Sequence, residues 1–61
     1  MLRDAIDELP SRERDVVIMR HYEGLSNQEI GILLDVEAAT VSKRHGRAML
    51  RLHEILFNPQ G

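Results

Sequence analysis

The hydrophobic positions of this chain recur at helical spacing, and no segment shows the strict alternation of a half-buried strand. Leu2, Ala5, Ile6 and Leu9 follow the i, i+3, i+4, i+7 pattern that places one apolar stripe on a helix. Pro10 follows directly, and a proline cannot continue a helix interior. The pattern therefore predicts a short first helix that ends at Pro10.

A second helix is predicted from Ser11 to the residues before Gly24. Ser11 stands where an N-cap belongs, and Glu13 lies near the positive end of the helix dipole. The run from Val16 to Met19 is too broad for one apolar stripe, so we expect its neighbours to surround it as the central core helix. Gly24 suits the left-handed residue just past a helix end.

The third helix has the clearest start in the chain. Ser26 and Glu29 have the spacing of a capping box, in which each side chain accepts a hydrogen bond from the backbone N–H of the other. A break of about three residues is predicted at 35–37. The apolar positions expected to face the core are Ile30, Leu33 and Leu34.

A long final helix is predicted from about Ala38 to Phe57. At about 100° per residue its side chains fall into a basic flank and an adjoining apolar flank. Leu50 breaks this pattern and is expected to be exposed, and residues 58–61 are expected to form a disordered tail after a domain spanning 1–57. The basic flank holds Thr40, Lys43, Arg44, Arg47, Arg51 and Glu54; the apolar flank holds Val41, Ala48, Leu52 and Ile55, followed by His45, Met49 and Leu56.

The charge is unevenly divided between the two parts of the chain. Residues 1–37 carry four basic and nine acidic side chains, a net of −5, whereas residues 38–61 carry four basic side chains and Glu54, a net of +3. Opposite signs within one small domain predict one face for a polyanion and another face turned elsewhere. The charge pattern alone is equally compatible with a charged helix that faces solvent and binds no partner.

Composition narrows the function classes. A chain of 61 residues without cysteine has no disulfide or sulfur metal site, and a core of this size hardly accommodates a deep catalytic cleft. No nucleophile–base spacing or phosphate loop is present, so neither an enzyme nor a cofactor is expected. The charged start does not resemble a signal peptide, and the cytoplasm is the default compartment.

The histidines and the last helix have less specific interpretations as well. His45 lies on the apolar flank and is expected to be a partly buried core residue, and His21, His45 and His53 do not have metal-ligand spacing. A basic amphipathic helix can also lie on an anionic membrane. We disfavour that interpretation because the apolar flank is needed to close so small a domain.

Two helices joined by a tight turn, the second longer and basic, form a helix-turn-helix, here over about 26–56. Gly31 is expected to let the two helices approach closely, with Val36 and Val41 filling the angle between them. The second helix of such a unit can enter the DNA major groove. The fold class is therefore predicted as all-α, a four-helix helix-turn-helix bundle without a wing.

The segments LPSRERDVVIMRHYEGLSNQEIGILL and ATVSKRHGRAMLRL resemble the C-terminal region 4 of bacterial sigma-70-family factors, most closely the extracytoplasmic-function (ECF) group. The resemblance covers residues 5–56. It implies a domain of a longer cytoplasmic, nucleoid-associated sigma factor that recognises the −35 promoter element as a monomer. It also implies docking on the RNA polymerase β-flap, with an anti-sigma factor as a further partner.

The resemblance also implies roles for individual residues. Ser42, Lys43, Gly46 and Arg47 match base-facing positions of the recognition helix, and Arg44 matches an arginine at the DNA backbone. Together with Thr40 and Arg51 of the basic flank, and with Ser26, Asn27 and Gln28 at the phosphate-facing start of the preceding helix, they form the expected DNA-binding set. Three residues depart from the family pattern: Asp35 replaces a turn glycine, Glu37 replaces an N-cap serine, and Gly46 interrupts the recognition helix.

Two alternatives remain at this point. The LuxR-type response-regulator domain shares the Leu25–Ile30 string, but it generally carries His and Asn where this chain has Arg44 and Arg47. The second alternative is mainly a protein-binding module, because an acidic helical bundle can leave an apolar groove for a partner helix. That alternative predicts an exposed hydrophobic patch that involves the first or second helix.

Overall fold

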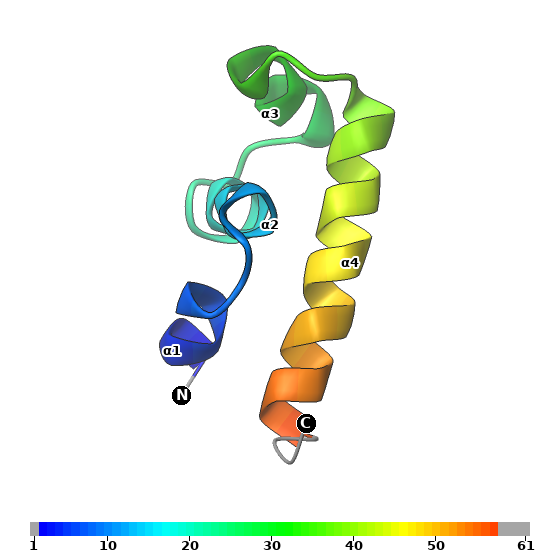
Figure 1. The fold of residues 1–61 in the computed structure, drawn as a ribbon. Helices are drawn as coiled ribbons and strands as arrows, with labels where there is room; N and C mark the ends of the chain where they lie inside the picture. Colours follow the sequence, from blue (N-terminus) through cyan, green and yellow to red (C-terminus); the bar gives the residue numbers. More distant parts are fainter. Residues whose placement is uncertain (1, 58–61) are drawn as a thin grey trace.

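A computed structural model of the chain describes residues 2–57, with Leu2 described as backbone only. The elements follow the order α1 (Leu2–Asp7), α2 (Ser11–Val17), the π-helix η1 (Ile18–Tyr22), α3 (Asn27–Leu34) and α4 (Ala38–Phe57). Helix α4 runs the length of the molecule, and the other elements lie along one side of it (Figure 1). Residues 2–57 contain no strand, which confirms the all-α prediction. The predicted tail, residues 58–61, and the Leu2 side chain lie outside the described residues.

Helix α4 closes two hydrophobic clusters with the elements beside it. Because these side chains come from helices far apart in the sequence, their burial fixes the rotation of α4 about its axis. One cluster holds Ala5, Ile6, Leu9, Val17, Ala48 and Leu52, and the other holds Val16, Ile30 and Val41.

The boundary between α1 and α2 differs from the prediction. Helix α1 ends at Asp7, before Pro10 is reached. Pro10 itself occupies the N-cap position of α2, with φ −54° and ψ 146°, and its carbonyl oxygen accepts hydrogen bonds from the N–H groups of Glu13 and Arg14. The expected N-cap role of Ser11 was therefore wrong: Ser11 is the first helical residue, because the fixed φ of proline already provides the helix entry.

The second predicted helix widens into the π-helix η1 after Val17. It ends before Gly24, whose φ of +72° confirms the predicted left-handed residue. Val16 and Val17 are buried, but Ile18 and Met19 are only half-buried. The expected burial around the whole helix was thus wrong beyond Val17, since Ile18 and Met19 only border the two hydrophobic clusters, one residue at each.

The capping box of α3 is confirmed. The Ser26 N–H donates to Glu29 Oε1 at 2.8 Å, and the Glu29 N–H donates to Ser26 Oγ at 3.1 Å. Ile30 is buried and Leu34 packs against its cluster, but Leu33 is 63% exposed, so its predicted core position was wrong. The buried face of this two-turn helix follows the i, i+4 pair, and Leu33 points outside it.

The turn after α3 is as tight as predicted. Asp35 adopts a left-handed conformation with φ 60°. A Cβ atom on Gly31 would lie 2.6 Å from the carbonyl oxygen of Val36 and 3.5 Å from the backbone N of Ala38. Gly31 therefore permits a close approach of the backbone that follows α3. The nearest part of that backbone is the turn at Val36, and the first residue of α4 is the next nearest.

Candidate nucleic-acid interface

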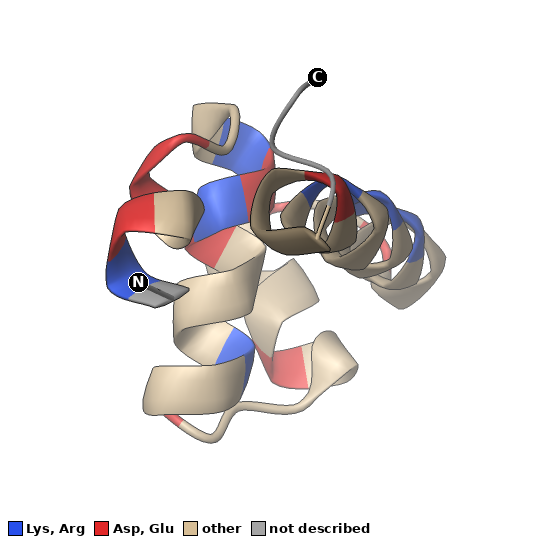
Figure 2. Ribbon diagram, turned by 90° about the horizontal axis from the view of Figure 1, so that it is seen from below, with Lys and Arg blue, Asp and Glu red and all other residues tan. Residues whose placement is uncertain are grey.

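The basic flank of α4 faces solvent, as the helical wheel predicts. Val41, Ala48 and Leu52 are buried against the rest of the domain, whereas Lys43 and Arg47 are exposed and Arg44 is half-buried. Figure 2 shows the basic positions of α4 in a row along one side of the helix. Packing of the apolar flank thus orients the cations outward.

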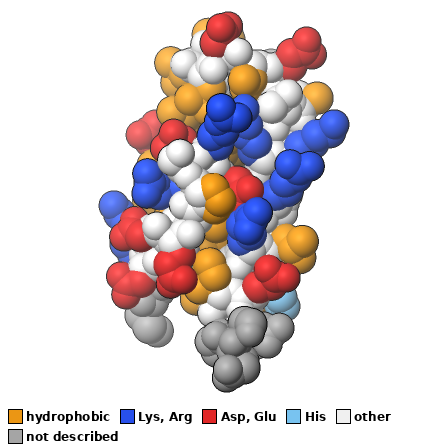
Figure 3. Space-filling view, in the orientation of Figure 1, with side chains coloured by type: hydrophobic (Ala, Val, Ile, Leu, Met, Phe, Trp, Pro, Cys, Tyr) orange, Lys and Arg blue, Asp and Glu red, His pale blue; other side chains and the backbone are white. Residues whose placement is uncertain are grey.

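A shallow surface hollow brings all four basic residues of the predicted DNA-binding set together. It lies between α4 and the start of α2, and basic side chains gather on the face where these helices meet (Figure 3). A row of cations that extends over about two helical turns is suited to the phosphates of a nucleic-acid backbone. The lining residues are Pro10, Ser11, Arg12, Glu13, Thr40, Lys43, Arg44, Arg47 and Arg51.

Arg12 belongs to this hollow, although sequence reasoning did not select it. It lies in the first turn of α2, which was interpreted only as a core helix. Arg12 lies four residues, or about one turn, before Val16 on the same helix. Because Val16 packs against Val41 of α4, the start of α2, and Arg12 with it, lies beside the basic flank. Arg12 adds a fifth cation to the four of α4.

Arg51 forms an ion pair inside the protein. Its Nε lies 2.8 Å from Oε1 of Glu13, whose residue is only 8% exposed. That carboxylate oxygen is buried and accepts no well-directed hydrogen bond among the described residues, so the attraction is chiefly one between charges. Glu13 thus has two roles: it is an acidic residue in the first turn of α2, as predicted, and it is also the counter-ion of Arg51.

The other predicted site residues lie outside the hollow. Ser42 and Gly46 are exposed on α4, and a Cβ atom on Gly46 would meet nothing within 4 Å. At the start of α3, Ser26 is engaged in the capping box and the Oδ1 of Asn27 accepts a 2.8 Å hydrogen bond from Arg20. Gln28 borders a different depression, formed with the turn before α4.

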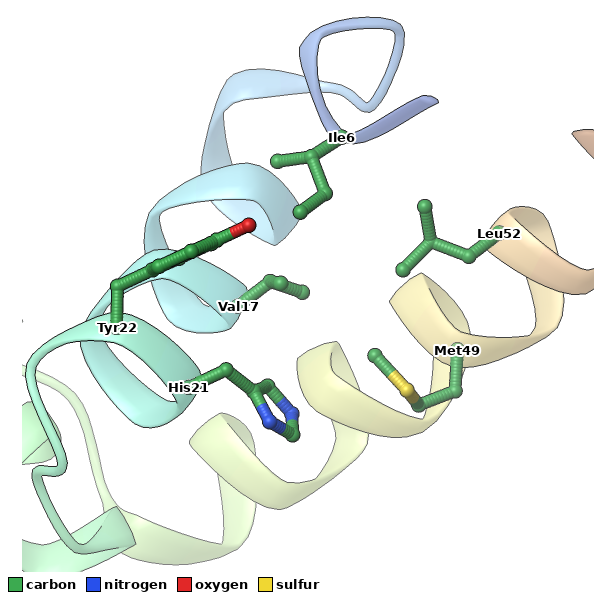
Figure 4. A pocket seen from close by; sticks show the side chains of 6 residues that line it. All are labelled: Ile6, Val17, His21, Tyr22, Met49 and Leu52. Atoms are coloured by element: carbon green, nitrogen blue, oxygen red, sulfur yellow. The ribbon is translucent and has the colours of Figure 1, made fainter. Parts of the chain in front are cut away.

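An apolar hollow of about 340 Å³ opens on another part of the surface, between α1, η1 and α4. Figure 4 shows the six side chains around it, of which five come from these elements and Val17 comes from the end of α2. Tyr22 is 54% exposed, and the guanidinium of Arg3 lies 5.9 Å from its ring centre. The lining residues are Ile6, Val17, His21, Tyr22, Met49 and Leu52.

Two ionisable groups are perturbed. Hydrogen bonds from the Ser26 backbone and side chain lower the pKa of the Glu29 carboxyl. Burial, followed by the charges of Arg20 and His21, lowers the pKa of His45, which is half-buried as predicted. The described residues contain no group of three or more His, Asp or Glu side chains placed to hold a metal ion, and no helix among them is long and apolar enough to cross a membrane.

The family described as Sigma-70, region 4 matches residues 1–52. The chain belongs to this family. This sigma region 4 chain is 39% identical over 56 residues to the RNA polymerase sigma-E factor of Streptomyces antibioticus, covering 92% of this chain and 31% of that protein. It is 38% identical over 56 residues to the sigma-E factor of Streptomyces coelicolor, with 92% and 32% covered.

A relative of another kind is the RNA polymerase sigma factor FliA of Yersinia enterocolitica, which is 40% identical over 55 residues, with 90% of this chain and 24% of that protein covered. The sigma region 4 chain thus spans about a third or less of the length of these relatives. No solved structure matches it significantly. The family consists of DNA-binding regulatory domains and is not a family of enzymes.

The structure shows how this sigma region 4 domain accommodates its departures from the family pattern. Asp35 adopts the left-handed conformation that a glycine would adopt more easily. Glu37 is exposed, and its carbonyl oxygen accepts hydrogen bonds from the N–H groups of Thr40 and Val41, so it caps α4 through its backbone. Gly46 leaves α4 continuous from Ala38 to Phe57. None of the three breaks the helix-turn-helix.

Proposed function

We propose that this sigma region 4 domain recognises the −35 promoter element for a longer sigma factor of the ECF type. In this proposal α4 enters the major groove, which is wide enough to admit an α-helix. The observation that carries the proposal is the rotation of α4, whose buried Val41, Ala48 and Leu52 direct a row of cations outward. The family match favours this proposal over the response-regulator alternative.

The residues of α4 divide into two roles in the proposal. Ser42, Lys43, Gly46 and Arg47 face the bases, and Arg44 contacts the DNA backbone. Arg51, which is held in place by its ion pair with Glu13, contributes a positive charge at the edge of the DNA-contacting surface. Thr40 and Arg12 complete the basic hollow, and Ser26, Asn27 and Gln28 approach a neighbouring phosphate from the start of α3.

The expected affinity of the domain alone is low. Four basic side chains on α4 correspond to a slope of about −3 to −4 in log affinity against log salt. Tethering to a second promoter-reading domain and to polymerase would raise the effective concentration. The relatives, which are about three or more times longer, support such an arrangement. The domain would act as a monomer in the bacterial cytoplasm, at the nucleoid, with no catalytic step and no cofactor.

The test compares two single-charge removals in a DNA-binding assay over a range of salt concentrations. Arg47→Ala removes an exposed cation of the basic hollow, whereas Arg3→Ala removes an exposed cation of α1, near the apolar hollow. Arg47→Ala is expected to weaken binding to a −35 duplex and to make the salt slope shallower by about 1, and Arg3→Ala is expected to leave the slope unchanged. Equal effects of the two substitutions would contradict the assigned face.

We also propose that the apolar hollow receives a helix of a protein partner, either the polymerase β-flap or an anti-sigma factor. The support is the exposed apolar surface between α1, η1 and α4, together with the acidic side chains of α1 and its following loop, which would favour a basic partner. Tyr22→Ser is expected to weaken binding to purified polymerase core without changing DNA affinity. Unchanged core binding would contradict the docking role of this hollow.

A further inference from the structure

His21 and His45 meet across the domain from positions 24 residues apart in the chain. Their Nε2 atoms lie 2.9 Å apart, and the planes of the two rings differ by 24°. The ring centres are 5.2 Å apart, farther than the nitrogens by about one ring width, so the two nitrogens point toward each other along the line between the rings. Figure 4 shows His21 extending from η1 toward α4.

This in-line geometry fits a shared proton. An N–H···N hydrogen bond forms along the lone pair of the accepting nitrogen, as the two rings are placed here. A metal ion would instead require both lone pairs to converge on a point beside that line. The described residues also provide no third ligand group for a metal ion.

The protonation states of the pair determine whether the bond can exist. A neutral imidazole carries one N–H, so one ring donates from Nε2 and the other accepts at Nε2. One additional proton can bind at Nδ1 of the donating ring without breaking the bond. A second additional proton makes both Nε2 atoms donors and places two cations next to each other, and the bond is then lost.

The surroundings of the pair also disfavour two positive charges. The η1 segment contributes Arg20 and Tyr22, and α1 contributes Arg3, whose guanidinium lies over the Tyr22 ring. The groups beside the pair from α2 and α4 are the uncharged Val17 and Met49, which line the same hollow. On α4 itself, Arg44 and Arg47 belong to the basic flank. Of these groups, Arg20 is the cation that acts on His45 together with His21.

We propose that His21 and His45 form a proton-sensitive latch that joins η1 to the middle of α4 and opens when both rings become cationic. The latch holds α4 beside Gly46, where the helix lacks a side chain and is intrinsically weakest. Its other half lies in η1, a π-helix, which is a rare form of helix that mostly occurs as a single turn. Opening therefore loosens the segment between Lys43 and Arg47.

The sign of the pH dependence follows from His45. Its pKa in the folded protein is below the value of about 6.5 that it has when unfolded, because burial and nearby cations disfavour its charged form. The unfolded chain therefore binds more protons below about pH 6.5. The contribution of neutral His45 to the free energy of unfolding is complete above about pH 6.5, and it is lost as the pH falls through the pKa of His45 in the folded protein.

The test is an NMR titration of the three histidine side chains of the 61-residue chain, with His53 as the internal control. His53 is exposed on α4 and contacts Phe57, outside the pair. The latch predicts that the His21 and His45 signals each respond to both protonation steps of the pair. Independent single-step curves for His21 and His45 would overturn the proposal.

A second measurement uses His21→Gln, His45→Gln and the double variant. Thermal unfolding at pH 7.5 and at a pH below the last histidine protonation step of the titration gives the coupling between the two positions at each pH. The latch predicts a favourable coupling at pH 7.5 that is lost below that last step. The same coupling at both pH values would mean ordinary packing without a proton switch. If a variant does not fold, the titration of the native chain still decides.

Discussion

Arg51, six residues before the end of α4, reaches the first turn of α2, where its Nε lies 2.8 Å from Oε1 of Glu13. Arg51 is about half exposed, but Glu13 is nearly buried. This single contact connects the basic flank to the helix beside it, so it serves the stability of the domain as well as its surface charge.

Arg51→Ala should destabilise the domain more than Arg47→Ala. Removing Arg51 leaves a nearly buried carboxylate without its counter-ion, which costs about 1–3 kcal/mol once the exposure of Arg51 is taken into account. Arg47 is exposed on the same helix and its removal should change the unfolding free energy by at most about 0.5 kcal/mol. Urea unfolding measures both. A loss for Arg51→Ala no greater than that for Arg47→Ala would show that the ion pair contributes nothing to stability.

The two helical glycines should respond to alanine in opposite directions. Gly31→Ala places a Cβ atom 2.6 Å from the carbonyl oxygen of Val36, so the turn must shift, at a cost of about 1–3 kcal/mol. Gly46→Ala meets nothing within 4 Å and should stabilise α4 by about 0.5–1 kcal/mol. Thermal unfolding of the two variants provides the comparison. A loss of stability in Gly46→Ala would contradict an unobstructed outer face at that position.

Asp35→Gly should raise the stability of the turn. Asp35 has φ 60°, a conformation that costs a residue with a Cβ about 1 kcal/mol or more and costs glycine little. Part of the gain is offset by the greater freedom of glycine in the unfolded chain, so a net gain of up to about 1 kcal/mol is expected. Asp35→Val is the opposite control and should lower the melting temperature. Similar melting temperatures for both variants would argue against strain in this turn.

Ser26→Ala should lower stability, whereas Ser11→Ala should have little effect. Ser26 accepts a hydrogen bond from the backbone of Glu29, worth about 1 kcal/mol in comparable caps, but Ser11 makes no side-chain cap. The pKa of Glu29 is lowered first by the Ser26 N–H and second by the Ser26 hydroxyl, and the stabilisation that accompanies this shift is present above about pH 4.3 and is lost as the pH falls through the folded-state value. Ser26→Ala keeps the N–H, so its melting curves from pH 6 to pH 3 should fall only slightly less steeply. A loss of stability at pH 6 no greater than that of Ser11→Ala would contradict the capping role of Ser26.

Local features of the chain were predictable because each depends on a few neighbouring residues. The capping box at Ser26, the left-handed Gly24 and the burial of Val41, Ala48 and Leu52 follow from spacing alone. The same holds for the exposure of Leu50, which is 63% exposed. Periodicity thus determined the two flanks of α4, and with them the position of the basic face.

Features that depend on how helices meet were not predictable. The outward position of Leu33, the π-helix after Val17 and the contact of Arg12 with the basic hollow arise when α2 and α3 pack against α4. The ion pair of Glu13 and the contact between His21 and His45 join residues distant in sequence. No spacing rule within one helix selects such pairs, because the relative placement of two helices decides them.

The most direct test of the central claim is a map of backbone amide chemical shifts of the chain as a duplex carrying a −35 element is added. The account predicts that the largest changes lie in residues 40–51 of α4 and at the start of α2, with little change at Ile6, Tyr22 and Leu52 around the apolar hollow. The largest changes around that apolar hollow, with the basic flank unaffected, would contradict it.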